Sequence, residues 1–363
     1  MFYLNRSPRG LLMGDAFTTR STDDYSLFYN PALMGRNDGL SVRPFNLTLA
    51  TTNALDDLDR FEDFPSSDPA AIANRIMGFP IFIQAGVAPS FKMGPFGFSL
   101  LANSQSSMVL RNRVHPILSV NHRYDRGFIF GAAFSKGTGA KASIWDGRKA
   151  VRKKKTTAGT RASAGFSIKK INREGIQGDF DIFGTSLYSK IINGVEDASD
   201  IKEALGYSKG EAWGLDLGAD FVRSSGAMEF GVGLSILDVG DTQFKKTEGS
   251  ADIPLQEMVV ATGTHFGIDF GIGEFVTSFD LHPINQGHDF LRMSHFGVEL
   301  TLPFISLMSG FNSGYLSYGV ELNLWLIRIV AGFYGVELSR GYKVDEGKRA
   351  VLYISLFDLS FDS

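Results

Sequence analysis

The sequence predicts an all-β fold, an antiparallel transmembrane β-barrel of about 14 strands with an N-terminal plug and short helical insertions. Apolar and polar residues alternate with a period of two from one end of the chain to the other. The alternating runs are about 10 to 14 residues long, which suits a tilted crossing of a bilayer better than the average strand of a soluble sandwich. Small and polar residues on the second face suit a wet or filled interior.

The clearest alternation lies in residues 212–236. One face of its first half carries Trp213, Leu215, Leu217, Ala219 and Phe221. After a turn at 223–226, Met228 to Ile236 repeat the pattern with Glu, Gly and Ser between them, which predicts a β-hairpin. Comparable runs occur at 96–100, 128–134, 257–270, 275–281, 296–302 and 315–325. Each run predicts one strand of the wall, and the run 350–361 predicts the strand that closes the barrel.

Composition excludes several other classes of protein. The 363 residues include 41 Gly and 31 Phe but no Cys, so a disulfide framework and a thiol nucleophile are excluded. The net charge of −3 offers no basic surface for nucleic acid. The most apolar run, 322–333, is broken by Asn323 and Arg328, which excludes a membrane-spanning helix. MFYLNRSPRG shows no signal peptide, so we expect either no export or a mature N-terminus.

The predicted inner face carries titratable side chains. These are Asp216, Asp220, His265, Asp269, Glu299 and Glu321. We interpret them as hydrated or plug-bonded residues of the lumen; a polar pathway or a catalytic set is the alternative. There is no G-x-S-x-G motif, and the histidines lack the spacing of a metal site. We therefore expect no enzyme, no cofactor and no metal.

Residues 10–33 are predicted to be the plug of the barrel. This stretch is too short to fold alone, yet it carries small residues, a polar turn and an aromatic cluster that must be buried elsewhere. The candidate plug or ligand contacts are Phe28, Tyr29, Asn30 and Pro31. Pro31 fixes φ and starts a turn, while the Asn30 amide can bridge the plug to the lumen. A simple turn remains the alternative for Asn30-Pro31. We expect residues 1–39 to form the plug segment and 40–363 to form the barrel.

Two further segments depart from the strand pattern. Helical spacing at 185–195 and 198–205 predicts a helical insertion at about 177–210, and a short helix is expected at 68–77. We interpret these helices as lids over their loops, with a lipid-facing or gating role as the alternative. A basic run could meet lipid phosphates or could be a solvated loop; it comprises Arg148, Lys149, Arg152, Lys153, Lys154 and Lys155.

The N-terminal stretch resembles the opening of FadL-like and PorV-like outer-membrane barrels. Met13, Gly14, Ala16 and Phe17 match a GMGGAF-type segment, Asp23 and Asp24 match an acidic turn, and residues 29–32 match a Tyr-Asn-Pro-Ala motif. HFGVEL at 295–300 and SGFNSGYLSYGVEL at 309–322 also resemble this superfamily. The resemblance implies an integral protein of a Gram-negative outer membrane, with about 14 strands and an N-terminal plug.

The same resemblance leaves two functions open. FadL-like members imply binding or passage of lipids or other hydrophobic molecules, whereas PorV-like members imply docking of other proteins. A structural barrel that assembles with copies of itself, with partner proteins or with membrane lipid is therefore the alternative to transport. An open diffusion porin is disfavoured, because the plug would have to leave the lumen.

Overall fold

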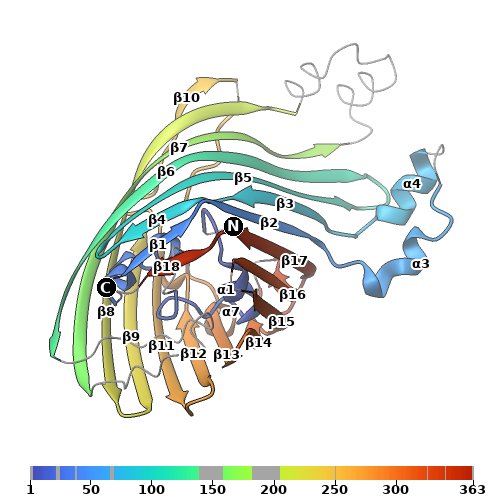
Figure 1. Ribbon diagram of the computed structural model, residues 1–363. Coiled ribbons are helices and arrows are strands. Elements are labelled where there is room, and N and C mark those ends of the chain that lie inside the picture. Colours follow the sequence, from blue (N-terminus) through green and yellow to red (C-terminus); the bar gives the residue numbers. More distant parts are fainter. Residues whose placement is uncertain are drawn as a thin grey trace.

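The computed structural model describes residues 3–21, 25–36, 39–65, 69–138, 158–181, 205–249, 251–324, 326–339 and 341–361. These residues form one closed antiparallel β-barrel that surrounds the N-terminal segment (Figure 1). The alternation in the sequence explains the wall, because successive side chains of a strand point to opposite faces.

Fourteen strand positions make up the described wall, and four of them consist of two consecutive segments each. The split positions are β1 (Leu40–Arg43) with β2 (Phe45–Thr52), β3 (Ile81–Val87) with β4 (Ser90–Met93), β9 (Met228–Leu237) with β10 (Lys245–Glu248), and β17 (Glu346–Leu356) with β18 (Leu359–Phe361). The others are β5 (Phe96–Arg111), β6 (Ile117–Thr138), β7 (Gly159–Asp181), β8 (Ser208–Ser225), β11 (Val259–Asp269), β12 (Glu274–Leu281), β13 (Ser294–Leu302), β14 (Ile305–Asn312), β15 (Tyr315–Leu324) and β16 (Ile327–Glu337).

The last strand position closes the ring on the first. Leu352 of β17 lies opposite Leu49 of β2, and Phe361 of β18 lies opposite Leu40 of β1. The prediction of a closed antiparallel barrel of about 14 strands is therefore confirmed, as is the role of the C-terminal run in closing it.

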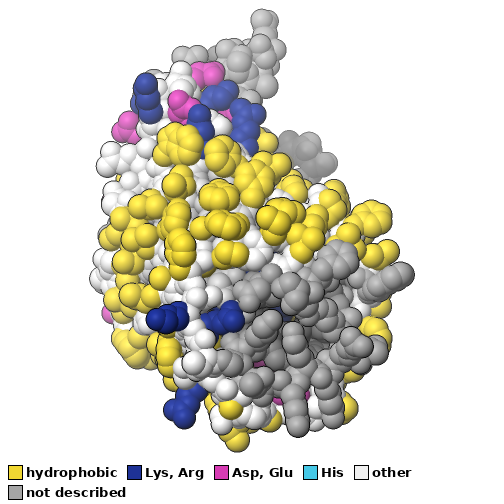
Figure 2. All heavy atoms as spheres, turned by 60° about the vertical axis from the view of Figure 1, so that its left-hand side comes forward, with side chains coloured by type: hydrophobic (Ala, Val, Ile, Leu, Met, Phe, Trp, Pro, Cys, Tyr) yellow, Lys and Arg dark blue, Asp and Glu magenta, His cyan; other side chains and the backbone are white. Residues whose placement is uncertain are grey.

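The outer face of the wall is apolar. Phe, Leu, Ile and Trp side chains with exposed surface recur at alternate positions, as in Trp213, Leu215 and Leu217 of β8. Figure 2 shows these side chains gathered in a band, with Lys, Arg, Asp and Glu side chains above it. A closed barrel with such a band satisfies its backbone internally and places hydrocarbon against lipid. The protein is accordingly an integral outer-membrane β-barrel.

The wall is taller on one side. Strands β5 to β8 contain 16, 22, 23 and 18 residues, whereas β11 to β17 contain 8 to 11. The described hairpins 94–95, 226–227 and 303–304 lie at one end of the barrel and are short. Short turns are typical of the periplasmic end. We therefore call the opposite end, where β2, β5 and β7 finish, the outer mouth.

The N-terminal segment lies inside the ring. It contains α1 (Pro8–Leu12), α2 (Ser26–Tyr29) and the 3-10 helix η1 (Pro31–Arg36), and α1 begins with proline, whose fixed φ suits a first helical turn. All its described residues are buried except Arg6 and Arg9, which are half-buried. We call the described residues 3–36 the plug.

The remaining helices lie at the outer mouth. Between β2 and β3 are η2 (Leu55–Asp57), α3 (Leu58–Phe61) and α4 (Pro69–Ile76), and α4 matches the helix expected at 68–77. Between β12 and β13 are η3 (Ile284–Gln286) and α7 (Phe290–Met293). None of the helices in the described ranges has the length and apolar character to span a membrane.

The predicted helical insertion is narrower at both ends than expected. Residues 177–181 belong to β7, because they pair with Ile117 to Asn121 of β6, and β8 already begins at Ser208. The helices expected at 185–195 and 198–205 lie outside the described residues, apart from Leu205, which is in a turn.

Candidate functional site

Inward-facing glycines bring the plug against the backbone of the wall. A Cβ placed on any of ten of them would lie within 3.2 Å of a plug atom, so a larger residue would push the plug away. These glycines are Gly97, Gly131, Gly165, Gly218, Gly233, Gly263, Gly297, Gly310, Gly319 and Gly332, each on a different strand. We call them the glycine belt.

Arg36 fixes the end of the plug to β8. Its Nε and one terminal nitrogen donate hydrogen bonds to the two carboxylate oxygens of Asp220, at 2.7 and 2.5 Å. Both side chains are fully buried. A bidentate pair of this kind has a defined geometry, and either partner left alone would be an uncompensated buried charge.

Two further plug arginines bind acids on the opposite side of the wall. Arg9 lies between Glu299 of β13 and Glu321 of β15, with Glu321 at 3.2 Å. Arg20 donates to Glu274 of β12 at 2.8 Å and lies 3.6 Å from Glu299. The predicted inner residues Glu299 and Glu321 thus contact the plug directly.

The other predicted inner residues have partners within the wall. Asp216 accepts a hydrogen bond from Lys169 at 2.6 Å, and His265 lies 3.1 Å from a carboxylate oxygen of Glu229. Asp269 is the last residue of β11, where its carboxylate accepts a hydrogen bond from the backbone of the following turn. Asp269 therefore caps a turn at the periplasmic end.

Tyr29 is the centre of the polar contacts inside the plug. Its hydroxyl donates to Asp15 at 2.9 Å and accepts a hydrogen bond from the backbone N–H of Ser7. Burial raises the pKa of the Tyr29 phenol well above its usual range, so the hydroxyl stays protonated and keeps donating. Phe28 is buried beside Tyr25, with ring centroids 6.1 Å apart.

Asn30 bridges the plug and the wall. Its amide nitrogen lies 3.3 Å from the carbonyl oxygens of Thr18 in the plug and Ala219 in β8. The next residue, Pro31, lies against Gly165 of the glycine belt. The Asn-Pro pair therefore occupies a place where glycines let the wall backbone come close to the plug.

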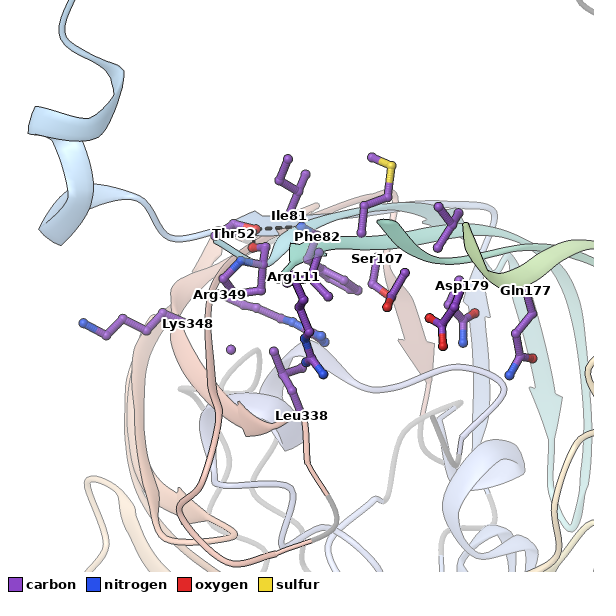
Figure 3. A pocket seen from close by; sticks show the side chains of 18 residues that line it. Thr52, Ile81, Phe82, Ser107, Arg111, Gln177, Asp179, Leu338, Lys348 and Arg349 are labelled. Carbon is purple, nitrogen blue, oxygen red and sulfur yellow. Dashed lines mark hydrogen bonds between the residues drawn. The ribbon is translucent and has the colours of Figure 1, made fainter. Parts of the chain in front are cut away.

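A cavity of about 310 Å³ opens at the outer mouth (Figure 3). Phe82, Val109 and Leu338 contribute apolar surface, whereas Gln177 and Arg349 contribute polar groups. The Arg349 guanidinium lies over the Phe82 ring, 3.5 Å from its centroid. A second space of about 30 Å³ shares Arg349 and reaches the plug residues Tyr3, Leu4, Asn5, Arg6 and Leu11. The larger cavity thus lies above the plug.

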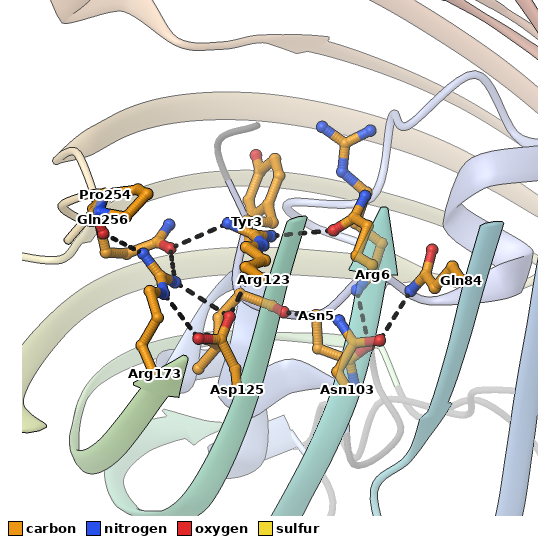
Figure 4. Close-up of polar contacts among 12 residues, drawn as sticks. Tyr3, Asn5, Arg6, Gln84, Asn103, Arg123, Asp125, Arg173, Pro254 and Gln256 are labelled. Atoms are coloured by element: carbon orange, nitrogen blue, oxygen red, sulfur yellow. Dashed lines mark hydrogen bonds and ion pairs between the residues drawn. The ribbon is translucent and has the colours of Figure 1, made fainter. Parts of the chain in front are cut away.

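A buried polar cluster holds the start of the plug beneath this cavity (Figure 4). Arg173 of β7 forms a bidentate pair with Asp125 of β6, at 2.6 and 3.0 Å, and also donates to Gln256 at 2.9 Å. Arg123 donates to the carbonyl oxygen of Tyr3 at 2.9 Å. Sequence reasoning missed this cluster. The inward positions of Asp125 and Arg173 were the available signal, since these residues are direct cross-strand partners.

The ladder between the first two strand positions is interrupted at Asn46 and Ala88. The register of β1 with β4 differs by one residue from that of β2 with β3. The Asn46 side chain fills the interruption, donating to the carbonyl oxygen of Ala88 and accepting from its N–H, both at 2.6 Å. We call this place the seam.

The structure does not test the predicted basic run. The basic run Arg148, Lys149, Arg152, Lys153, Lys154 and Lys155 lies outside the described residues. Within the described part of the chain, no group of three or more His, Asp or Glu side chains is arranged to hold a metal ion.

Comparison with known proteins returns matches among solved structures. No family model matches the chain, and no curated protein matches it significantly. A TodX deltaS2S3 mutant monoaromatic hydrocarbon channel matches at 11% identity and a TM-score of 0.49, over 97% of this chain and 99% of that chain. The Ralstonia pickettii toluene transporter TbuX matches at 12% identity and 0.44, over 98% and 99%. A Pseudomonas aeruginosa FadL homologue matches at 9% identity and 0.31, over 99% of each chain. At such values the similarity does not extend to function.

Proposed function

We propose that this outer-membrane β-barrel binds or passes small hydrophobic molecules, entering from the outer mouth. The observation that carries the proposal is the cavity of about 310 Å³ between the outer mouth and the plug. Binding sites for small molecules are commonly clefts of about 300 to 1,000 Å³ with mostly apolar walls and a few polar groups. The cavity has the size for a small molecule and is too small for a folded partner.

The lining of the cavity supports a molecule that is largely apolar. Phe82, Val109 and Leu338 supply hydrocarbon, and the buried Arg349 and the amide of Gln177 supply orienting polar groups. A molecule that leaves this cavity toward the periplasm meets the plug next. Passage therefore requires the plug contacts of Arg9, Arg20 and Arg36 to rearrange, whereas binding alone does not.

A pair of substitutions in β5 tests the proposal. Val109→Trp places a large ring in the cavity, whereas Ser104→Trp adds the same ring to an outward-facing residue of the same strand that does not line the cavity. In vesicles of phosphatidylethanolamine and phosphatidylglycerol, the barrel should speed uptake of a labelled hydrocarbon, and Val109→Trp should slow it several-fold. Equal uptake by both variants and by vesicles without protein would contradict the proposal.

A structural or docking barrel is the second candidate. This function is favoured by the many contacts between the plug and the wall. The glycine belt and the ion pairs of three plug arginines keep the plug in the lumen. Native mass spectrometry from mild detergent separates the two functions. A monomer that carries a small hydrophobic molecule supports transport, whereas an assembly that carries phospholipid or partner protein supports the structural function.

A further inference from the structure

An arm projects from the outer mouth of the barrel. It comprises η2, α3 and α4, residues 53–80, and extends sideways from the wall in Figure 1. It leaves the wall after Thr52 of β2 and returns at Ile81 of β3. Pro80, at the return of the arm, lines the cavity, but η2, α3 and α4 do not, so the plug and the cavity do not explain these helices.

Two arginines hold the helices of the arm together. Arg60 of α3 donates to the carbonyl oxygens of Arg75 and Met77, at 2.8 and 3.2 Å. Arg75 of α4 donates in return to the carbonyl oxygen of Asp59 at 3.1 Å. The Phe61 ring packs edge-on against Phe79 with centroids 5.2 Å apart. These reciprocal bonds hold α3 and α4 together without a large core.

The root of the arm pairs with the end of β5, beyond the point where β3 begins. Met77 forms a β-bridge with Leu110 of β5, and the N–H of Gly78 donates to the Leu110 carbonyl oxygen at 2.7 Å. Leu110 has the outward parity of its strand, yet it is only 2% exposed. The root of the arm is therefore fixed to the wall at the outer-mouth end of β5.

The outer part of the arm exposes a set of large apolar side chains. Leu55, Leu58, Phe61 and Phe64 recur every three residues, and Leu58 is 59% exposed and Phe61 39%. Between them stand acidic residues, including the exposed Asp59 and Glu62. Exposed apolar side chains with charged residues between them are typical of a segment that lies at a membrane surface.

We propose that the arm lies in the outer leaflet of the membrane, with Leu55, Leu58, Phe61 and Phe64 among the lipid chains. The neighbouring lipid-facing wall identifies lipid as the occupant. Ile83, just beyond the return of the arm, is 55% exposed on the outer face of β3, and Leu49 is exposed on β2. The apolar face of the arm thus continues the band that faces hydrocarbon.

This arrangement gives the arm a physical role. The arm extends the lipid contact of the barrel at the outer-mouth end of β2 and β3, the strands that it connects. It anchors the barrel at a fixed depth, since its acidic residues stay in water while its apolar residues leave water. The inference is independent of whether the barrel transports anything.

Site-directed spin labelling tests the proposal. The sequence contains no cysteine, so each single-cysteine variant is labelled at one position only. Leu58→Cys is compared with Asp59→Cys, which places the label on the adjacent exposed position of the same helix, and with Leu217→Cys on the lipid-facing wall. The full chain is reconstituted in vesicles of phosphatidylethanolamine and phosphatidylglycerol. Collision rates with oxygen report lipid, and those with a water-soluble nickel complex report water.

We expect the label at position 58 to resemble the label at 217, with a nickel collision rate several-fold below that at 59. Equal nickel access at 58 and 59 would show that the arm stands in water and would overturn the proposal. Protection at 58 from both reagents, with spin–spin broadening that disappears on dilution with unlabelled protein, would show a second copy and would also overturn it. Heat-modified gel mobility confirms that each variant is folded.

Discussion

The imidazole rings of His282 and His295 stack in parallel, with centroids 3.8 Å apart and planes 4° from each other. The two rings contact the plug at the turn formed by Gly14 and Asp15. One nitrogen of His295 lies 3.0 Å from the carbonyl oxygen of Gly14, and one nitrogen of His282 lies 3.1 Å from that of Asp15. Because buried carbonyl oxygens need donors, the two rings hold this turn in place.

Removing one ring should loosen the plug. His295→Ala leaves the Gly14 carbonyl oxygen without this donor and opens a space beside His282, at a cost of about 1 to 3 kcal/mol. We expect faster hydrogen exchange in residues 10–21, measured by mass spectrometry on the detergent-purified barrel. His115→Ala, in the exposed turn 112–116, is the control. Unchanged hydrogen exchange in the plug would show that His282 and His295 fill space without holding the turn.

The glycine belt should not tolerate a large residue. Gly218→Leu would meet Asn30 and Pro31, so overpacking should lower the free energy of unfolding by about 1 to 3 kcal/mol or displace the plug. Ala219→Leu adds the same side chain one residue later on the exposed outer face and should have little effect. Thermal unfolding in detergent measures the difference. Similar losses from both substitutions would contradict close plug contact at Gly218.

The Arg36–Asp220 pair allows a double-mutant cycle. Arg36→Met alone leaves a buried carboxylate and should cost about 3 to 5 kcal/mol, and Asp220→Leu alone leaves a buried guanidinium with a similar cost. The double variant should regain much of the loss, because neither charge is then left alone. Denaturant unfolding reports the coupling. Additive losses would mean that the pair does not hold the plug.

The seam should open when its amide is removed. Asn46→Ala leaves the Ala88 N–H and carbonyl oxygen without the Asn46 partners, at a cost of about 1 to 3 kcal/mol per unmade bond. Hydrogen exchange should rise in residues 84–93, whereas Thr51→Ala, on the exposed outer face of the same strand position, should leave it unchanged. Equal protection from hydrogen exchange in both variants would mean that the neighbouring ladder hydrogen bonds, rather than Asn46, hold the seam closed.

Much of the wall could be predicted because the alternation within each strand shows which residues face inward and which face outward. Trp213 and Leu215 face outward and Asp216 faces inward as the alternation requires, and the same pattern predicted ring closure by the C-terminal run. The plug also left a local signal, since its aromatic residues had no partner within their own segment.

The partners inside the lumen could not be predicted from periodicity. Arg36 and Asp220 are 184 positions apart, and alternation says that Asp220 faces inward without saying which residue meets it. The histidine pair was considered only for metal spacing, because stacking against a backbone turn has no sequence signature. The lengths of β6 and β7 also escaped prediction, since their upper parts carry polar outward residues such as Arg126 and Glu174.

The glycine belt also bears on the order of assembly. The plug contacts ten strands of the closed ring and forms ion pairs on opposite sides of it. It therefore has little room to enter the lumen after the ring has closed. The plug precedes the wall in the chain, and the ring is completed only when β17 and β18 meet β2 and β1. The wall is therefore expected to close around the plug, which makes the plug a template for the shape of the barrel as well as its contents.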